Sequence, residues 1–537
     1  MESPERATAD THWDAECDVL VLGFGAAGAA AAITARESGA DVLAADRFDG
    51  GGATAMSGGV VYAGGGTAQQ KAAGYEDTPA AMFNYLRQET GDAVRHDTLH
   101  RFCEDSAALI QWLEGLGADF TSTVPPPKTS YPKDGVYLYY SGNEPVPACA
   151  EHAKPAPRGH RTRGSWLSGR TLFNLLRQRV EALGVRVWQR SAVHRLIVDA
   201  HGAVVGAEVW RLPPGTPAEA EHRRLTAKAD KLHNVFGGWA DRLRAKAAAL
   251  EMHAGTRLRV RARRGVVLST GGFVFNRQMM QCYAPKYLQN LRLGTAGDDG
   301  SGIRLGQSVG GATARLDKVS AWRFINPPTA WPKGIVVAGD GRRFCNEQVY
   351  GAKLGVAMCE DHDGHAWLIL DRKTRRAALR EALFGGLWFF QSVPAFILML
   401  FAPRARSIAA LARRIGVPSE PLAAALGDYN TAARSGATDP LGKADDFRQP
   451  LDTPPYYALD ISAGNGRFPC PAITLGGLRV DEADGQVLKA DGTPVGGLYA
   501  AGRTAIGIPS NNYVSGLSIA DCLWSGRRAG TAAAGTP

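Results

Sequence analysis

Residues 17–46 read CDVLVLGFGAAGAAAAITARESGADVLAAD, and their pattern is the strongest indication of fold class in the chain. An apolar run typical of a buried strand leads through a glycine turn into an alanine-rich helix, and a second apolar run follows. Strand, helix and strand in this order predict a βαβ unit, which belongs to a parallel sheet with helices packed on it.

Three glycines mark the turn between the first strand and the helix. Gly23, Gly25 and Gly28 form GxGxxG, and Asp46 ends the second strand. The first glycine makes the tight turn, the second lets backbone approach a pyrophosphate, and the third lets the helix pack on the strand. An acid at position 46 suits a ribose hydroxyl and disfavours a phosphorylated ribose. The pattern predicts a dinucleotide site, with a ligand-free tight turn as the alternative.

Glycine is abundant and clustered in the rest of the chain as well. There are 64 glycines in 537 residues, well above the average of about 7%. The segment 50–67, GGGATAMSGGVVYAGGGT, has no periodicity, and further glycine turns follow strand-like runs in 263–273 and 496–504. A nicotinamide-binding domain would move straight on to its next helix, whereas a larger, extended flavin needs more such backbone. We expect the four turns to converge on one ligand.

Charge and cysteine usage exclude several function classes. The formal net charge is +9, but no Lys/Arg run with interleaved aromatic residues occurs, so nucleic-acid binding is not expected. The eight cysteines show no CxxC and no Cys/His ligand spacing, which predicts free thiols and no metal site. Residues 1–16 lack an apolar core and do not read as a signal peptide. The expected location is cytoplasmic.

The longest apolar run is LWFFQSVPAFILMLFA, residues 387–402. It is too short to span a bilayer, which takes about 20 residues. In one interpretation, this run is part of the hydrophobic core of its domain. In the other, it lies in a membrane interface, with Arg404 and Arg406 following it, so that a lipid-like substrate enters the protein without crossing water.

The remaining patterns predict a divided chain. Strands alternate in 184–211, a charged helical insertion near 212–255 serves either partner contacts or solvation, and 340–460 is rich in helical periodicity. Ser407 is a predicted helix cap, and Gly416 and Pro418 are predicted helix breakers. We therefore expect an FAD-binding domain in 17–325 and 461–537, with a catalytic or capping domain inserted at 326–460.

The chain resembles the FAD-dependent fumarate reductase and 3-ketosteroid dehydrogenase superfamily over nearly its whole length. The matching pieces are DVLVLGFGAAGAAAA (18–32), ATAMSGGVVYAGGGT (53–67), RARRGVVLSTGGF (261–273), GRRFCNE (341–347), TLGGLRVD (474–481), GGLYAAGRT (496–504) and YVSGLSIADCLWSGRRAG (513–530). The resemblance implies an α/β fold: a Rossmann-like FAD-binding domain of the GR2 type, with a parallel sheet plus a β-meander, and an inserted α+β domain.

The sequence departs from the fumarate enzymes at two positions. Those enzymes carry a proton-donating arginine where this chain has Gly351 and a substrate-binding histidine where it has Ile473. Glycine and isoleucine cannot pair with a dicarboxylate, so that chemistry is not expected. YYSGNE (139–144), PAPRGH (155–160) and the Tyr-x-Ser-Gly of NNYVSG (511–516) instead resemble the 3-oxo-5α-steroid 4-dehydrogenases, with the steroid 1-dehydrogenases as the alternative.

The resemblance also implies a set of site residues. Tyr513 and Ser515 are assigned to proton abstraction as base and relay, in an order left open, and Tyr350 to positioning or polarising the substrate. Tyr139 and Tyr140 are pocket walls or strand packing; Asp521 reads equally as a cofactor contact or a helical acid. Noncovalent FAD is expected on Gly23, Gly25, Ala26, Ala27, Gly28, Asp46, Arg47, Ala53, Thr54, Ser57, Gly58, Gly59, Val193, Thr270, Gly271, Gly272, Gly502, Arg503, Gly516, Leu517 and Ser518, although Arg503 also reads as a surface arginine.

The expected reaction introduces a C=C bond next to a 3-keto group, at Δ4 of a 5α-3-ketosteroid. A base takes the acidified proton and the flavin N5 accepts hydride. Alternatives are 1-dehydrogenation, the reverse reduction of an enone, and a flavoprotein without turnover. Expected partners are a steroid or other hydrophobic ketone and an electron acceptor, a quinone or another acceptor but not NAD, with peripheral membrane contact through 387–402.

Overall fold

The computed structural model of the protein describes residues 3–125 and 129–535. Within these residues a nine-stranded sheet has the order β1-β8-β9-β10-β2-β3-β7, with β21 on β10 and β20 on β21. The strands β2, β3, β7, β10 and β21 run parallel, whereas β8, β9 and β10 pair antiparallel. Their bounds are β1 (Glu5–Arg6), β2 (Ala15–Leu22), β3 (Val42–Ala45), β7 (Arg186–Trp188), β8 (Ser191–Val198), β9 (Val204–Arg211), β10 (Thr256–Leu268), β20 (Gln486–Leu488) and β21 (Pro494–Ala500).

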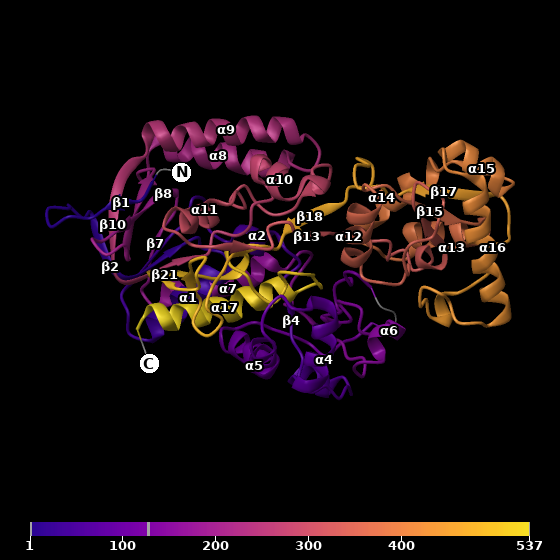
Figure 1. Ribbon diagram of the computed structural model, residues 1–537, viewed down its shortest axis with the longest axis horizontal. Helices are drawn as coiled ribbons and strands as arrows, with labels where there is room; N and C mark the ends of the chain where they lie inside the picture. The colour runs from indigo at the N-terminus through magenta and orange to yellow at the C-terminus, as the bar shows by residue number, and fades with distance from the viewer. Residues whose placement is uncertain (1–2, 126–128, 536–537) are drawn as a thin grey trace.

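Two helices from opposite ends of the chain cover one face of this sheet. Helix α1 (Ala26–Glu37) and helix α17 (Leu517–Ala533) lie side by side (Figure 1), and α7 (Gly169–Ala182) packs beside α1. Small residues explain the close approach, because a Cβ at Gly526 or Gly530 would overlap backbone of Ala27 or Ala31. The C-terminal segment is therefore built into the first βαβ unit.

Smaller sheets and helices extend the molecule on both sides of the main sheet. Below it in Figure 1, α4 and α5 pack near the sheet β4-β6-β5. Two helices, α8 and α9, follow β9 and precede β10 in the sequence. They run along the top of the same view. The bounds are α2 (Gly52–Met56), β4 (Val60–Tyr62), α3 (Ala68–Ala72), α4 (Pro79–Thr90), α5 (His96–Gly115), β5 (Leu138–Tyr139), α6 (Pro147–Ala150), β6 (Gly159–Arg161), α8 (Pro217–Leu232) and α9 (Gly237–Ala254).

A four-stranded sheet, β14-β15-β17-β16, lies with α12 to α16 at the right of Figure 1. The bounds are α10 (Arg277–Tyr283), η1 (Pro285–Tyr287), β11 (Leu291–Arg292), α11 (Ser301–Ser308), β12 (Thr313–Ala314), β13 (Val319–Ala321), η2 (Trp331–Lys333), β14 (Ile335–Val337), α12 (Gly351–Asp361), β15 (Trp367–Leu370), α13 (Arg372–Phe384), α14 (Phe389–Leu400), β16 (Arg404–Ala405), α15 (Ile408–Ile415), α16 (Ser419–Ser435), η3 (Asp445–Phe447), β17 (Tyr456–Asp460), β18 (Pro471–Thr474), β19 (Gly477–Leu478) and η4 (Gly502–Thr504). The predicted cap is confirmed, because Ser407 Oγ accepts from Ala410 N at the start of α15, which ends at Gly416 with φ 71°.

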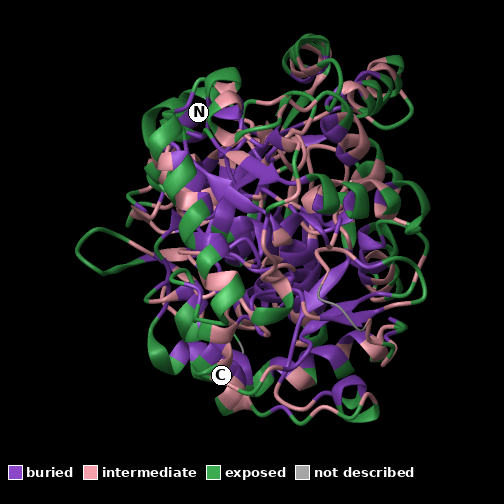
Figure 2. Cartoon of the chain, turned by 90° about the vertical axis from the view of Figure 1, so that its right-hand side faces the viewer, coloured by how far each residue is buried: buried purple, intermediate pink, exposed green. Residues whose placement is uncertain are grey.

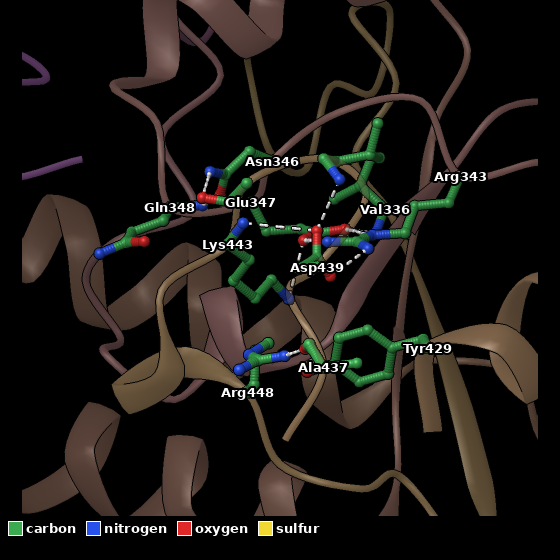
Figure 3. Close-up of polar contacts among 12 residues, drawn as sticks. Val336, Arg343, Asn346, Glu347, Gln348, Tyr429, Ala437, Asp439, Lys443 and Arg448 are labelled. Carbon is green, nitrogen blue, oxygen red and sulfur yellow. Dashed lines mark hydrogen bonds and ion pairs between the residues drawn. The ribbon is translucent and has the colours of Figure 1, made fainter. Parts of the chain in front are cut away.

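A buried ion network holds the GRRFCNE turn in place (Figure 3). Arg343 contacts Glu347 at 2.7 Å and Asp439 at 2.6 Å, and Lys443 Nζ lies 2.7 Å from Glu347. Burial raises the pKa of Glu347, but Lys443 and Arg343 outweigh it and hold that pKa below its ordinary value. The network pins the segment that leads directly into Tyr350.

The buried residues gather along the middle of the molecule, with exposed residues on the outer helices (Figure 2). Across residues 3–125 and 129–535, no helix is long and apolar enough to cross a bilayer. All eight cysteines are free thiols, and the same residues contain no cluster suited to a metal ion.

Candidate functional site

A cavity of about 1550 Å³ opens at the carboxyl ends of the parallel strands. The residues that follow β2, β3, β10 and β21 all line it: Gly23, Asp46, Ser269 and Ala501. Ligands of open parallel sheets bind at this edge. Pockets for small ligands measure about 300–1,000 Å³, so this cavity has room for a large cofactor and a second molecule.

The three glycines of the β2–α1 turn serve different purposes. Gly23 has φ 99°, and a Cβ there would lie 2.5 Å from the Ser269 carbonyl oxygen. A Cβ at Gly28 would overlap the Gly23 carbonyl oxygen, whereas one at Gly25 would meet nothing nearer than 3.7 Å. Gly23 and Gly28 are therefore required by the protein's own packing, while Gly25 leaves space open at the cavity wall.

Asp46 braces the turns on both sides of it. Its Oδ2 accepts from Phe24 N at 2.8 Å and its Oδ1 accepts from Phe48 N at 2.7 Å. Asp46 also lines the cavity. Each carboxylate oxygen can accept a second hydrogen bond, so the side chain remains available to a ligand hydroxyl.

The structure brings most of the residues predicted for cofactor binding to this cavity. Those that line it are Gly23, Gly25, Ala26, Ala27, Asp46, Arg47, Ala53, Thr54, Ser57, Gly58, Val193, Thr270, Gly271, Arg503, Gly516 and Ser518. Within the described part of the chain, five lie behind its wall instead: Gly28, Gly59, Gly272, Gly502 and Leu517. Gly272 N, for example, donates to Asp298 Oδ1 at 3.1 Å.

Arg503 and Asp521 are both buried, which corrects the surface interpretation of Arg503. Arg503 Nη2 lies 2.5 Å from Asp298 Oδ1, with its side chain 9% exposed. Asp521 accepts from Ile508 N at 3.0 Å, and burial raises the pKa of its carboxyl to about 6. Asp521 therefore holds the loop before Tyr513 from its place on α17.

Two predicted tyrosines meet at one side of the cavity. The rings of Tyr513 and Tyr350 lie 6.5 Å apart, and Trp322 stacks on Tyr513 at 5.2 Å. Tyr513 OH accepts from Gly516 N at 3.2 Å, at the N-terminus of α17. Burial raises the pKa of Tyr513 to about 12, and this backbone N–H opposes the rise.

Ser515 neighbours the phenol of Tyr350 and that of a third tyrosine, Tyr139. Burial raises the pKa of Tyr350 and of Tyr139, and the neighbouring Ser515 hydroxyl opposes both shifts. Tyr139 is fully buried, and its hydroxyl makes no regular hydrogen bond within the described residues. Ser515 and Tyr350 line the cavity, whereas Tyr139 lies behind them.

Asn143 fixes the backbone at Tyr350 and was missed in the sequence. Its Oδ1 accepts from Tyr350 N at 2.5 Å and its Nδ2 donates to Glu89 Oε1 at 2.8 Å. The motif YYSGNE, which contains Asn143, was noted for its resemblance alone. Only the folded chain brings the loop that contains Asn143 into contact with Tyr350, which lies 207 positions later in the sequence.

Other wall residues were also not predicted. His194 on β8 lines the cavity and stacks on Trp210 at 4.1 Å. Apolar side chains that include Trp322, Phe324 and Phe468 form the wall beside the tyrosines. No local pattern distinguishes these residues from ordinary core.

The two positions that separate this chain from the fumarate enzymes offer no cation. Ile473 lines the cavity. At Gly351 an added Cβ would lie 2.6 Å from the Phe324 ring. Neither position therefore supplies the charge that a dicarboxylate would require.

The residues present fit a flavin dinucleotide. Helix α1 begins at Ala26 after the N-cap residue Gly25, and Thr54 Oγ1 accepts from Ala26 N at 3.2 Å. Gly25 leaves space open beside this helix N-terminus. Arg503 Nη1 is buried and has no hydrogen-bond partner among the described residues. A helix N-terminus and a guanidinium both suit the anionic and carbonyl groups of such a cofactor.

Comparison with known proteins gives three findings. The sequence matches the FAD binding domain family over residues 18–519. It is 43% identical over 515 residues to 3-oxo-5α-steroid 4-dehydrogenase of Comamonas testosteroni, covering 92% of this chain and 93% of that one. It is 26% identical to 3-oxosteroid 1-dehydrogenase of Mycobacterium tuberculosis, with 93% and 94% covered.

The fold is also similar to a solved structure. The crystal structure of 3-ketosteroid Δ4-(5α)-dehydrogenase from Rhodococcus jostii RHA1, in complex with 4-androstene-3,17-dione, superimposes with a TM-score of 0.83. The identity is 31%, and 99% of this chain and 100% of that chain are covered.

Proposed function

The chain belongs to the FAD binding domain family. From this membership and from its similarity to the steroid 4-dehydrogenases, we propose that it is an FAD-dependent 3-ketosteroid dehydrogenase that introduces a double bond at Δ4 of a 5α-3-ketosteroid. FAD is its cofactor, and it is an oxidoreductase acting on CH–CH bonds. The observation that carries the proposal is a single cavity in which the cofactor turns meet a cluster of phenols in an apolar wall.

The division of labour follows from how each hydroxyl is held. Tyr513 is the base, because Gly516 N donates to its oxygen and a helix N-terminus stabilises the phenolate. Ser515, whose hydroxyl neighbours those of Tyr350 and Tyr139 and which lines the cavity, is the residue that we assign to the proton relay. Tyr350 is the donor that polarises the substrate carbonyl, since burial raises its pKa well above the ordinary value and keeps it protonated.

The bound flavin supplies the hydride acceptor. The chain's own residues must orient a flat, apolar substrate and exclude water. Trp322 and Phe324 lie against the two phenols, with Trp322 stacked on Tyr513 and Phe324 edge-on to Tyr350 at 5.5 Å. Such a wall favours a rigid hydrocarbon skeleton over a charged acid.

The proposal predicts bleaching of the yellow holoprotein by one class of steroid. Mixed anaerobically with a saturated 5α-3-ketosteroid, the flavin loses its visible absorbance and the steroid leaves as the 4-ene. A 4-ene-3-ketosteroid serves as the comparison, because it bleaches the flavin only if the enzyme acts at Δ1. Absence of bleaching across both classes removes the steroid proposal and leaves FAD binding intact.

Helix α14, which contains most of the apolar run 387–402, has one face in the hydrophobic core and one face exposed. Its inner face is core, with Ala395, Leu398 and Met399 buried. Its outer face is exposed: Phe389 is 56% and Val393 50% exposed, and both line the cavity. Deleting 387–402 would therefore destroy core packing, so substitutions on the outer face are the better test.

We propose that this outer face rests on a lipid bilayer, so that an apolar substrate enters the cavity from the membrane. The cavity wall continues into exposed aromatic side chains at Phe389 and Phe390, and Trp166 stacks on Phe389 at 5.1 Å. Arg404 and Arg406 are exposed nearby in sequence and suit anionic headgroups. The electron acceptor, a quinone or another acceptor but not NAD, stays a prediction.

The membrane proposal predicts a loss of binding on substitution of the exposed aromatics. Phe389→Ser with Phe390→Ser lowers co-sedimentation with anionic vesicles at least about tenfold, because two phenyl groups no longer leave water. Leu441→Ser, an exposed apolar residue on the loop after α16, is the control and changes little. Equal sedimentation of wild type and double variant contradicts the proposal.

A further inference from the structure

The helical hairpin α8–α9 forms part of the cavity wall. It was expected to serve partner contacts or solvation, and Figure 1 shows its two helices side by side along the top of the view. Residues from both helices and their connection line the same cavity as the GxGxxG turn: Thr226, Asp230, Lys231, Asn234, Ala248 and Glu251. Several of these are polar, unlike the apolar wall beside the tyrosines. The hairpin therefore faces the cofactor side of the cavity.

One carboxylate fastens the hairpin to the cofactor turn. Glu251 on α9 accepts from Arg47 Nε with both oxygens, at 2.9 and 3.0 Å, and lies 2.8 Å from His222 Nε2 on α8. Arg47 directly follows Asp46 at the end of β3 and also contacts Asp299 at 3.0 Å. Glu251 is 6% exposed.

Both the geometry and the charges of the two side chains favour the contact between Arg47 and Glu251. Burial raises the pKa of Glu251, but Arg47 and His222 outweigh it and hold that pKa below its ordinary value. The carboxylate therefore stays ionised, and its hydrogen bonds from Arg47 are charge-assisted.

The same ion pair lies where the main cavity adjoins a second one. A cavity of about 510 Å³ lies between α9 and α10, and Arg47, Glu251 and Asp299 line both cavities. If the Arg47–Glu251 ion pair breaks, the boundary that these two side chains form between the cavities is lost next to Asp46. Separation of α9 from Arg47 would thus open the cofactor side of the site.

We propose that the α8–α9 hairpin is the outer wall of the FAD site and that Glu251, through Arg47, retains the bound cofactor. The hairpin is an insertion between two neighbouring strands of the sheet, so it can move away without breaking a strand pair. Glu251 is a positioning residue in this proposal. The inference rests on the cofactor alone and not on the steroid substrate.

The experiment measures release of FAD from the holoprotein. Glu251→Gln keeps the size of the side chain and leaves Arg47 paired with Asp299, so the variant retains a partner for the guanidinium. Loss of a charge-assisted contact worth about 1.5–3 kcal/mol predicts dissociation of FAD that is roughly ten- to a hundredfold faster. The readout is the rise of free FAD fluorescence after dilution.

The control is Glu221→Gln on the same hairpin. Glu221 pairs with Arg224 within α8 at 2.7 Å and makes no contact with Arg47, so FAD release should match the wild type. A second measurement is hydrogen exchange of 217–254, which should slow when the apoprotein is reloaded with FAD. Equal release from wild type and Glu251→Gln, or no change in exchange, overturns the proposal.

Discussion

Tyr513→Phe lowers the rate of flavin reduction by a 5α-3-ketosteroid about 1,000-fold, within the range that loss of a general base costs. The substitution removes one oxygen, the one that accepts from Gly516 N. The ring keeps its stacking on Trp322, so the shape of the wall is preserved. FAD content is expected to stay at the wild-type level.

The pH dependence of the same rate follows from the raised pKa. Burial raises the pKa of Tyr513 to about 12, so at pH 7 the phenol is neutral and the proton-accepting form is scarce. The fraction of phenolate grows about tenfold per pH unit below that pKa. The wild-type rate should therefore increase with pH between 7 and 10, and Tyr513→Phe should lose this increase.

The matched control is Tyr499→Phe, which changes a half-buried tyrosine on β21 outside the cavity wall. Stopped-flow absorbance under anaerobic conditions measures both variants. A Tyr513→Phe protein that reduces its flavin as fast as the control, or that keeps the wild-type pH profile, rules out the assignment of Tyr513 as base. A variant without FAD would instead indicate a structural role.

Gly25→Ala abolishes stable FAD binding while leaving the apoprotein folded. An added Cβ at position 25 meets no atom nearer than 3.7 Å, so the fold tolerates it. The methyl group occupies the space left open at the start of α1, where backbone must approach the cofactor phosphates. We expect the affinity for FAD to fall at least about a hundredfold, a loss of roughly 2.7 kcal/mol.

Gly28→Ala acts on the fold itself. The added Cβ would overlap the Gly23 carbonyl oxygen, so the β2–α1 turn must distort, at a cost of about 1–3 kcal/mol or more. The unfolding temperature of the apoprotein falls for Gly28→Ala and not for Gly25→Ala. Titration with FAD and thermal unfolding distinguish the two effects.

Gly115→Ala is the control for both substitutions, because a Cβ at the end of α5 meets nothing within 4 Å. It should leave the affinity for FAD and the stability of the apoprotein at wild-type values. Full FAD affinity in Gly25→Ala would contradict the cofactor geometry that the turn implies. An unchanged unfolding temperature in Gly28→Ala would contradict the packing argument.

The sequence predicted the elements whose chemistry is local. Gly23, Gly25 and Asp46 lie within one βαβ unit, and a glycine turn next to a helix has few other physical uses. Tyr513 was singled out because it lies in a polar loop before a helix N-terminus; it lines the cavity, and its role as base stays a prediction. Ser407 was recognisable as a cap for the same reason, since a cap bonds within three residues.

The residues that the sequence did not reveal are held by contacts between segments that are distant in the chain. Asn143 holds Tyr350 across 207 positions, and Glu251 reaches Arg47 across 204 positions. Arg503 was equally readable as a surface residue until Asp298 was found beside it. No local pattern predicts such pairs, because each side chain alone is an ordinary polar residue.

The amino-acid sequence alone was sufficient to predict a dinucleotide-binding fold and an FAD-type set of glycine turns, and to exclude the two charged residues of the fumarate enzymes at positions 351 and 473. Backbone turns and motif residues act within a few positions, and residue type alone constrains them. Three features could be seen in the tertiary structure alone: the contact between Tyr350 and Tyr513, the part of the cavity wall that the α8–α9 hairpin forms, and the face of α14 that is exposed. These depend on how buried surfaces close on one another, and that is a property of the whole chain.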